Sequence, residues 1–309
     1  MTNIFAPHFQ NEDKAREHLE AIRWPDGPEC PHCTLINATK IEGKSARPGL
    51  YQCNGCRQQF TVTVGTVFER SKVPLHKWLL ATHLMCASKK GVSAHQLHRT
   101  LGVTYKTAWF MAHRIREAMK DEGGPRGGPG LDVEADETYF GQDKTAPKSR
   151  TAIRNMNKIV SLVDRATGRS VSFHVTDNLT AETIGQILYT NVDRSSRLLT
   201  DEAKHYIRPG WSFASHGSVN HAAKEYVSLA DRTLHTNTIE GFFGIFKRGM
   251  KGIYQHCSSK HLHRYLAEFD FRYTKRAGNG FDDMTRTAEL LKGIAGKRLT
   301  YRRTAGAAA

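Results

Sequence analysis

The sequence lacks any apolar run close to the ~20 residues that a membrane-spanning helix needs. Its first residues, MTNIFAPHFQNEDK, also lack the apolar core of a secretory signal peptide. Acidic residues are scarce relative to basic ones, because 30 aspartates and glutamates face 45 lysines and arginines, a formal charge of +15. A surplus of positive charge indicates a polyanionic partner, with nucleic acid as the first candidate. We therefore expect a soluble, cytoplasmic protein without a membrane partner.

Cysteine is also sparse, and four of the six cysteines form two close pairs. CPHC contains Cys30 and Cys33, and CNGC contains Cys53 and Cys56 after nineteen intervening residues. In a cytoplasmic chain, paired CxxC units indicate metal ligands before they indicate disulfides. Four thiolates suit tetrahedral zinc with no open position, so we predict a structural Zn²⁺. The histidine-rich run HCSSKHLH at residues 256–263 is an alternative second metal site, although a basic surface near nucleic acid also explains it.

Glycine and proline cluster in one place, DEGGPRGGPG at residues 121–130, a composition typical of a linker. After it, we expect a strand, a hairpin, a helix, a short strand and further helices, one of them near AAKEYVSLA, which is a mixed α/β order. The chain is expected to divide into an N-terminal helix (1–28), a zinc ribbon (29–70), a helix-turn-helix region (71–122), a linker (123–130), an α/β domain (131–280) and a basic C-terminal tail (281–309).

Two helical patterns before the linker have the proportions of a helix-turn-helix. SAHQLHRTL is followed by a Gly102 turn and by YKTAWFMAHRIREAMK, with Thr104 as the expected cap of the second helix. That helix has an apolar face and a basic face, as a recognition helix requires. The predicted DNA contacts are Tyr105, Lys106, Thr107 and Arg114. The alternative is an ordinary solvated helix face in a structural bundle.

Carboxylates recur at the ends of predicted strands. In LDVEADETYF, alternation places Asp132, Glu134 and Asp136 on one face and the apolar residues on the other. The apolar run SRLLTD ends at Asp201, and Glu240 follows at the start of a predicted helix. Oxygen ligands converging from separate elements are what a pair of magnesium ions needs. Each carboxylate is also consistent with a charged, solvated face.

The stretch HTNTIEGFFGIFKRG at residues 235–249 predicts an aromatic, basic helix. At about 100° per residue, one seam of this helix contains Glu240, Gly244, Lys247 and Lys251. Glu240 and Lys247 then point the same way, so the lysine can hold a phosphate while the carboxylate holds a metal. The spacing of Asn237 and Glu240 also matches a capping box, which needs no catalysis to explain it.

Taken together, these motifs resemble a known family. They include CPHC with CNGCRQQF, GTVFERSKVPLHKWLLATHLM, TYKTAWFMAHRIREAM, VEADETYFG, LLTDEAKHY, HTNTIEGFFGIFKRG and HRYLAEFDFRY, in order from about residue 10 to 303. The chain resembles the insertion-sequence transposases with an N-terminal zinc ribbon and an ISXO-type DDE domain. The resemblance implies an RNase H-like catalytic domain over 131–280.

The same resemblance implies roles for single residues. Asp136, Asp201 and Glu240 would bind two Mg²⁺ or Mn²⁺ ions, and Lys247 would complete the catalytic set. Lys247, Arg248 and Lys251 would contact DNA. Residues 142–143, Gln and Asp, depart from the expected glycine-rich or basic continuation after the first carboxylate, which puts DNA contact there in doubt.

The implied reaction is hydrolysis of a phosphodiester at the terminal inverted repeats of an element, followed by attack of the freed 3′ hydroxyl on target DNA. Double-stranded DNA is the implied partner, a homo-oligomer the implied form on two paired ends, and a prokaryotic nucleoid the implied location. Two other classes share these features: a zinc-ribbon DNA-binding regulator without catalysis, and an RNase H-like nuclease. Joining of cut ends to a target would distinguish a transposase from both.

Overall fold

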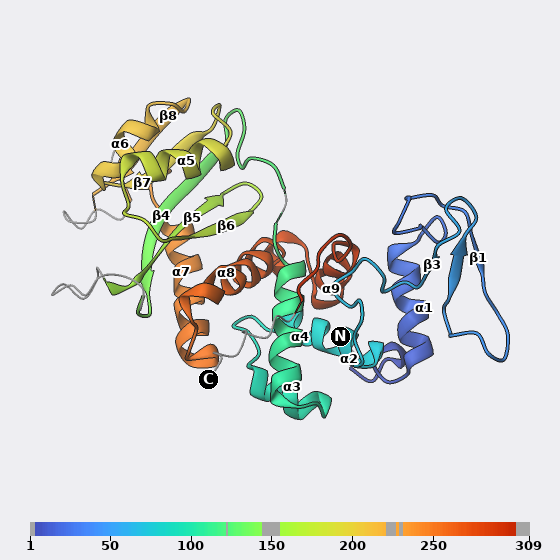
Figure 1. Cartoon of the computed structure of the whole chain (residues 1–309). Coiled ribbons are helices and arrows are strands. Elements are labelled where there is room, and N and C mark those ends of the chain that lie inside the picture. The colour runs from blue at the N-terminus through green and yellow to red at the C-terminus, as the bar shows by residue number, and fades with distance from the viewer. Residues whose placement is uncertain (1–3, 122, 144–154, 221–226, 229–230, 301–309) are drawn as a thin grey trace, which may run out of the picture. The chain divides into compact units, whose positions relative to one another are not determined.

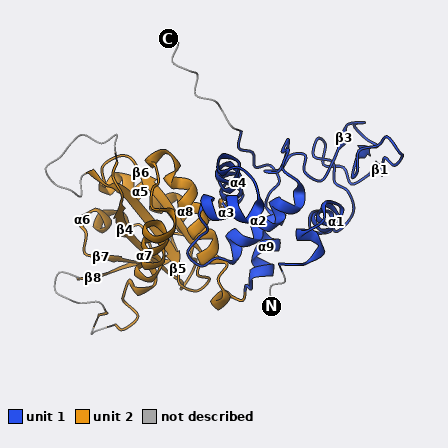
Figure 2. Cartoon of the chain, turned by 90° about the horizontal axis from the view of Figure 1, so that it is seen from below, with its two compact units in different colours: residues 1–119, 281–309 blue, residues 120–280 orange. Residues whose placement is uncertain are grey.

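The computed structural model describes residues 4–121, 123–143, 155–220, 227–228 and 231–300 (Figure 1). The chain forms two compact units, one of residues 1–119 with 281–309 and one of residues 120–280 (Figure 2). Within the described ranges, no helix is both long and apolar enough to cross a membrane.

The first unit starts with a short 3₁₀ turn, η1 (Pro7–Phe9), and with α1 (Glu12–Arg23). The Asn11 side chain caps α1 by accepting the backbone N–H groups of two residues in its first turn. A small antiparallel sheet follows, formed by β1 (Ala38–Lys40), β2 (Tyr51–Cys53) and β3 (Gln59–Phe60). Trp24 packs edge-on against Tyr51 and Phe60, so α1 and this sheet share one apolar cluster.

Three helices complete the first part of this unit: α2 (Leu75–Ala87), α3 (Ala94–Leu101) and α4 (Tyr105–Ala118). The Ser93 hydroxyl caps α3 and the Thr104 hydroxyl caps α4. Gly102 ends α3 in the left-handed conformation at φ 59°, where a residue with a Cβ is disfavoured. The two predicted helices and their glycine turn are therefore present, whereas their use as a DNA-binding motif stays a prediction.

The C-terminal segment differs from the predicted basic tail. Residues Asp283–Lys292 form α9, which packs against α1 and α2. The Asp282 carboxylate caps α9, and Arg286 donates to the carbonyl of Cys86 at 2.9 Å. Residues 281–300 are thus part of the first unit, and residues 301–309 lie outside the described residues.

The second unit is built on a five-stranded mixed sheet. Its strands are β4 (Asp132–Phe140), β5 (Asn157–Asp164), β6 (Ser170–Val175), β7 (Arg197–Asp201) and β8 (Ser215–Val219). Their order across the sheet is β6-β5-β4-β7-β8. The first three strands are antiparallel, and β7 and β8 run parallel to β4. The predicted mixed α/β class is confirmed.

Helices cover both faces of this sheet (Figure 1). On one face, α5 (Ala181–Asn191) and α6 (Lys204–Gly210) pack on apolar residues of β4 and β5. On the other lie α7 (Asn237–Gly249), a π-helical turn, η4 (Met250–Tyr254), and α8 (Ser259–Thr274), with the 3₁₀ turn η5 (Ala277–Asn279) after it. The predicted alternation in β4 is confirmed, since Val133 and Ala135 enter the core with α5.

The helix expected near AAKEYVSLA falls mostly outside the described residues, while α6 and β8 were not anticipated. The glycine-rich stretch is packed rather than free, because Arg126 is 2% exposed and pairs with Asp121. Gly127 has φ +83°, and a Cβ there would collide with Ser196. Residues 123–130 therefore belong to the second unit and are not a linker.

Candidate active site

Asp136 and Asp201 lie at the same level of two neighbouring parallel strands. Glu134 of β4 pairs with Leu199 of β7, and each aspartate follows two residues later. Because side chains two residues apart share a face, both carboxylates come to the same edge of the sheet. The apolar pattern of each strand fixes this register, since a slip of one residue would turn both aspartates to the other face.

A third carboxylate, Glu137, joins these two. Donor oxygens of Asp136, Glu137 and Asp201 all lie within 4.8 Å of one another. Glu137 also belongs to β4, and α6 holds its side chain: its carboxylate accepts a hydrogen bond from the Tyr206 hydroxyl at 2.8 Å and lies 3.2 Å from His205 Nε2. The sequence interpretation missed Glu137, because alternation assigns it to the face opposite Asp136. The available signal was its place directly after Asp136 in an acidic strand.

The three carboxylates repel one another, and a bound cation would reduce this repulsion. Burial, and then the charges of Glu137 and Asp201, raise the pKa of Asp136 to about 8; the charge of Glu240 adds a smaller contribution. Burial likewise raises the pKa of Asp201. Hard carboxylate oxygens crowded together at this spacing are the donor set that Mg²⁺ or Mn²⁺ prefers. The described residues thus fit a divalent cation.

Glu240 lies in the first turn of α7 and is exposed. It is not one of the carboxylates whose oxygens fall within 4.8 Å of one another. Its charge nevertheless contributes to the raised pKa of Asp136, so Glu240 lies in the neighbourhood of that carboxyl. The Thr236 hydroxyl donates to its carboxylate at 3.3 Å.

The predicted capping box at this helix is wrong. Thr236, one residue before Asn237, occupies the cap position of α7 and its side chain makes no cap hydrogen bond. The N–H of Ile239 is bound instead by the carboxylate of Glu134 on β4, at 2.8 Å. A strand carboxylate more than a hundred residues away therefore performs the capping that the local sequence suggested for Asn237.

The rest of α7 has the predicted two faces. Its apolar face is buried and consists of Ile239, Phe242, Phe243, Phe246 and Gly249. Lys247 is half-buried with its Nζ 6.0 Å from the ring centre of Phe243, while Arg248 and Lys251 are exposed. A Cβ at Gly244 would meet only the Arg248 guanidinium, so the backbone there is open to an approaching group.

The four paired cysteines come together as predicted. Cys30 Sγ lies 3.6 Å from Cys56 Sγ, and Cys33 Sγ lies 3.5 Å from Cys53 Sγ. Tetrahedral zinc with Zn–S bonds of about 2.3 Å requires S–S separations of about 3.8 Å. The cluster therefore fits a structural zinc ion. Within the described part of the chain, the histidines of HCSSKHLH form no comparable donor group.

The predicted DNA contacts of α4 divide into two sets. Tyr105 is 45% exposed and stacks on His95, Lys106 is exposed, and Thr107 is bound to its cap at Thr104. Arg114 differs from the prediction, because it is 6% exposed and donates to the carbonyl of Glu69 at 2.7 Å. Its guanidinium also lies over the Trp78 ring. Arg114 therefore holds the first unit together and is not on a basic surface.

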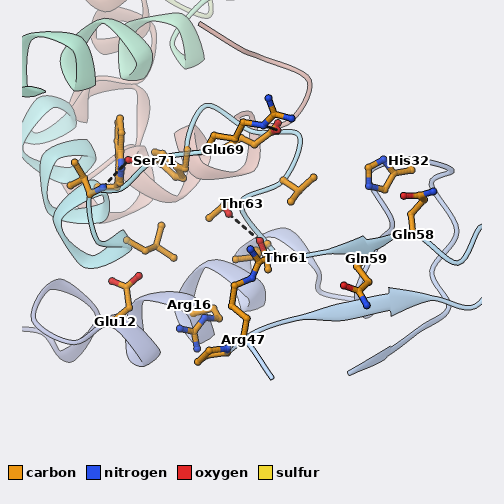
Figure 3. A pocket seen from close by; sticks show the side chains of 18 residues that line it. Glu12, Arg16, His32, Arg47, Gln58, Gln59, Thr61, Thr63, Glu69 and Ser71 are labelled. Carbon is orange, nitrogen blue, oxygen red and sulfur yellow. Dashed lines mark hydrogen bonds and ion pairs between the residues drawn. The ribbon is translucent and has the colours of Figure 1, made fainter. Parts of the chain in front are cut away.

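A polar cavity of about 600 Å³ lies in the first unit (Figure 3). It is beside the three-stranded sheet of β1, β2 and β3, which we call the cysteine sheet. Arg47, Gln58 and Gln59 contribute side chains to its wall, together with hydroxyl groups such as those of Thr61 and Thr63, which bond each other at 3.1 Å. Guanidinium, amide and hydroxyl groups of this kind are the usual donors to DNA phosphates. The sequence interpretation did not single out this surface.

Comparison with known proteins agrees with this architecture. Residues 128–274 match the ISXO2-like transposase domain, and residues 10–59 match the transposase zinc-ribbon domain. A protein of transposable element ISH50 from Halobacterium salinarum, itself uncharacterized, is 27% identical over 281 residues, 85% of this chain and 91% of that protein.

A chain in the cryo-EM structure of the simian T-cell lymphotropic virus intasome with PP2A regulatory subunit B56 gamma is 16% identical, at a TM-score of 0.29. The match covers 56% of this chain and 63% of that one. With a zinc-ribbon match and a DDE-domain match that together span well over half of its length, the chain belongs to the insertion-sequence transposases of the ISXO2-like type.

Proposed function

We propose that this protein cuts the ends of an insertion sequence and joins them to target DNA. The observation that carries the proposal is the meeting of Asp136 and Asp201 at one sheet edge, with Glu240 in the first turn of α7 close enough for its charge to act on Asp136. Crowded, partly buried carboxylates are unfavourable for folding unless a cation or a proton compensates them. Their retention at one point is therefore best explained by function.

Each residue of the site has a proposed task in this reaction. Asp136 and Asp201 would hold divalent ions, Mg²⁺ or Mn²⁺, from the sheet, and Glu240 would add a ligand from α7. Bound there, the ions would activate a water and stabilise the leaving 3′ oxygen. Glu137 is held by Tyr206 and completes the acidic wall. Lys247 keeps its ammonium group two turns from Glu240, where it neutralises the phosphate of the scissile strand.

The two chemical steps are both substitutions at phosphorus. In the first, water adds to the phosphorus, the P–O bond to the 3′ oxygen breaks, and that oxygen leaves as a hydroxyl after taking a proton. In the second, this 3′ hydroxyl attacks a target phosphodiester, loses its proton, and displaces the target's own 3′ oxygen. No covalent bond to the protein is needed, in agreement with a site built of carboxylates.

DNA binding is assigned to both units. Tyr105, Lys106 and Thr107 at the start of α4 are proposed to read or position the terminal inverted repeat. Lys247, Arg248 and Lys251 are proposed to hold the strand at the site. We further propose that two copies of the chain act on two paired ends.

Asp201→Ala tests this function. With an inverted-repeat duplex, a target plasmid and Mg²⁺, the wild-type protein should cut the duplex and join it, and the variant should lose both steps while DNA binding persists. Cleavage that survives in Asp201→Ala would refute the assignment. Cut strands that are never joined would favour a nuclease, and binding without Mg²⁺-dependent cleavage would favour a regulator.

A further inference from the structure

Glu134 is a completely buried carboxylate near the start of β4, at 0% exposure. One of its oxygens accepts the backbone N–H of Ile239 at 2.8 Å, in the first turn of α7. The other accepts the Nε of Arg165 at 2.5 Å. Burying a carboxylate costs several kcal/mol unless it is paired and hydrogen-bonded, so these two contacts account for its presence.

Arg165 connects the same strand to the segment before α7. Besides Glu134, it binds Asp132 of β4 at 3.0 Å. It also donates to the backbone carbonyls of Thr233 and His235, at 2.6 and 2.5 Å. One guanidinium thus links two carboxylates of β4 to the chain that leads into the helix.

The position of these contacts relative to the candidate site is specific. Glu134 lies on the same strand and face as Asp136, two residues earlier. Its partner Ile239 directly precedes Glu240. A carboxylate at a helix N-terminus also interacts favourably with the helix dipole, which favours one position of the first turn. The distance between Asp136 and Glu240 therefore depends on the hydrogen bond between the Glu134 carboxylate and the N–H of Ile239.

We propose that Glu134, with Arg165, is a positioning residue for the metal site: it fixes the first turn of α7 on β4 so that Glu240 stays in reach of Asp136 and Asp201. This inference rests on the proposed function, because it assumes that Glu240 is a ligand. It adds that an acidic residue outside the ligand set controls ligand placement through the helix backbone.

The first test measures metal affinity rather than turnover. Mn²⁺ binding to the full chain, purified with zinc, is followed by calorimetry for the wild type, Glu134→Gln and Arg165→Lys. Loss of a partner that orients a metal ligand typically weakens binding roughly 10- to 100-fold, and we expect a loss of at least about 10-fold.

Glu268→Gln is the matched control. Glu268 is also 0% exposed and pairs with a buried arginine, Arg272, at 2.6 Å on α8, and it also accepts from Tyr254. The Glu268→Gln variant should lose about as much stability as Glu134→Gln and keep the wild-type Mn²⁺ affinity. Equal affinity in Glu134→Gln, Arg165→Lys and the wild type would overturn the inference, as would an equal loss in Glu268→Gln.

A double-variant cycle separates this inference from the proposed function. If Glu134 acts through Glu240, adding Glu134→Gln to Glu240→Gln should cause little further loss of Mn²⁺ affinity. Fully additive losses would overturn the positioning role while leaving Glu240 as a ligand. Unchanged affinity in Glu240→Gln alone would refute both proposals, because there would be no ligand to position.

Hydrogen exchange provides a readout that does not depend on metal. Arg165→Lys is used here because it is a milder change than Glu134→Gln and serves if that variant fails to fold. In Arg165→Lys, peptides covering the first turn of α7 should exchange faster than in the wild type. Peptides from the second half of α7 should keep wild-type exchange, since their contacts are with the apolar core of the sheet. Uniform exchange along α7 in this variant would contradict the proposal.

Discussion

The hydroxyl of Tyr206 donates a 2.8 Å hydrogen bond to the carboxylate of Glu137, which ties the helix after β7 to the acidic centre of β4. Tyr206 is completely buried, so this bond has no competition from water. It directs the side chain of Glu137 along the sheet edge, where its oxygen meets those of Asp136 and Asp201. The acidic site is thus held from α6 as well as from the strands.

Tyr206→Phe should weaken metal binding more than it weakens the fold. The lost hydrogen bond lowers the free energy of unfolding by about 1 kcal/mol. Because Glu137 loses its fixed position, Mn²⁺ affinity should fall by roughly 10-fold, as measured by calorimetry. Tyr51→Phe is the control, since Tyr51 also donates to a carboxylate, Glu20, at 3.2 Å, in the first unit. An unchanged Mn²⁺ affinity in Tyr206→Phe would show that the Tyr206 hydrogen bond is not needed to place Glu137 at the site.

Metal affinity should rise with pH. The pKa of Asp136 is raised from 3.8 to about 8, so without metal the folded protein keeps this proton below that pH. A cation must displace it, and affinity should therefore increase about tenfold per pH unit up to about pH 8. Calorimetry at pH 6.5 in two buffers of different ionisation enthalpy should detect release of about one proton or more. Mn²⁺ binding without proton release would contradict the raised pKa.

Zinc should be necessary for the cysteine sheet but not for the second unit. Trp24 contacts Tyr51 and Phe60 of that sheet, so its near-ultraviolet circular dichroism reports on the sheet. Chelation or Cys53→Ser should abolish the Trp24 signal, identified by comparison with Trp24→Phe, because structural zinc sites supply folding free energy. Cys257→Ser, which lies outside the cluster, should leave it intact. A signal that persists after complete zinc removal would count against the zinc ribbon.

DNA affinity should fall steeply with salt, because phosphate contacts release counterions. Between about 50 and 200 mM salt, a plot of log affinity against log salt should be linear with a strongly negative slope. Lys106→Ala should make this slope shallower by about 1, the effect of one lost phosphate contact. Lys14→Ala is the control: it removes a lysine paired with Glu17 at 2.8 Å and should leave the slope unchanged. A flat plot for the wild type would argue against a backbone-dominated interface.

Local patterns in the sequence were sufficient for much of the fold. The predicted cap at Thr104 marks a helix start that the structure contains, because capping involves residues only three apart. The CxxC pairs predicted the cysteine cluster, since each pair needs only a tight turn to present two thiols. Strand alternation placed Asp136 on the face opposite Val133 and Ala135, because successive side chains of a strand point to opposite faces.

Only the tertiary structure decided which charged side chains serve the fold and which remain free. Arg114 has the spacing of a basic helix face, yet it is buried on the carbonyl of Glu69, forty-five residues earlier. Glu134 was consistent with a solvated acidic face and Glu137 was not singled out, but partners on α7 and α6 fix both. Charge and periodicity record the residue types on a face, whereas the free energy of a buried charge depends on partners far away in the chain. For that reason the sequence by itself determined the elements and the acidic residues, and the packing of α6 and α7 on the sheet decided how the acidic residues are held.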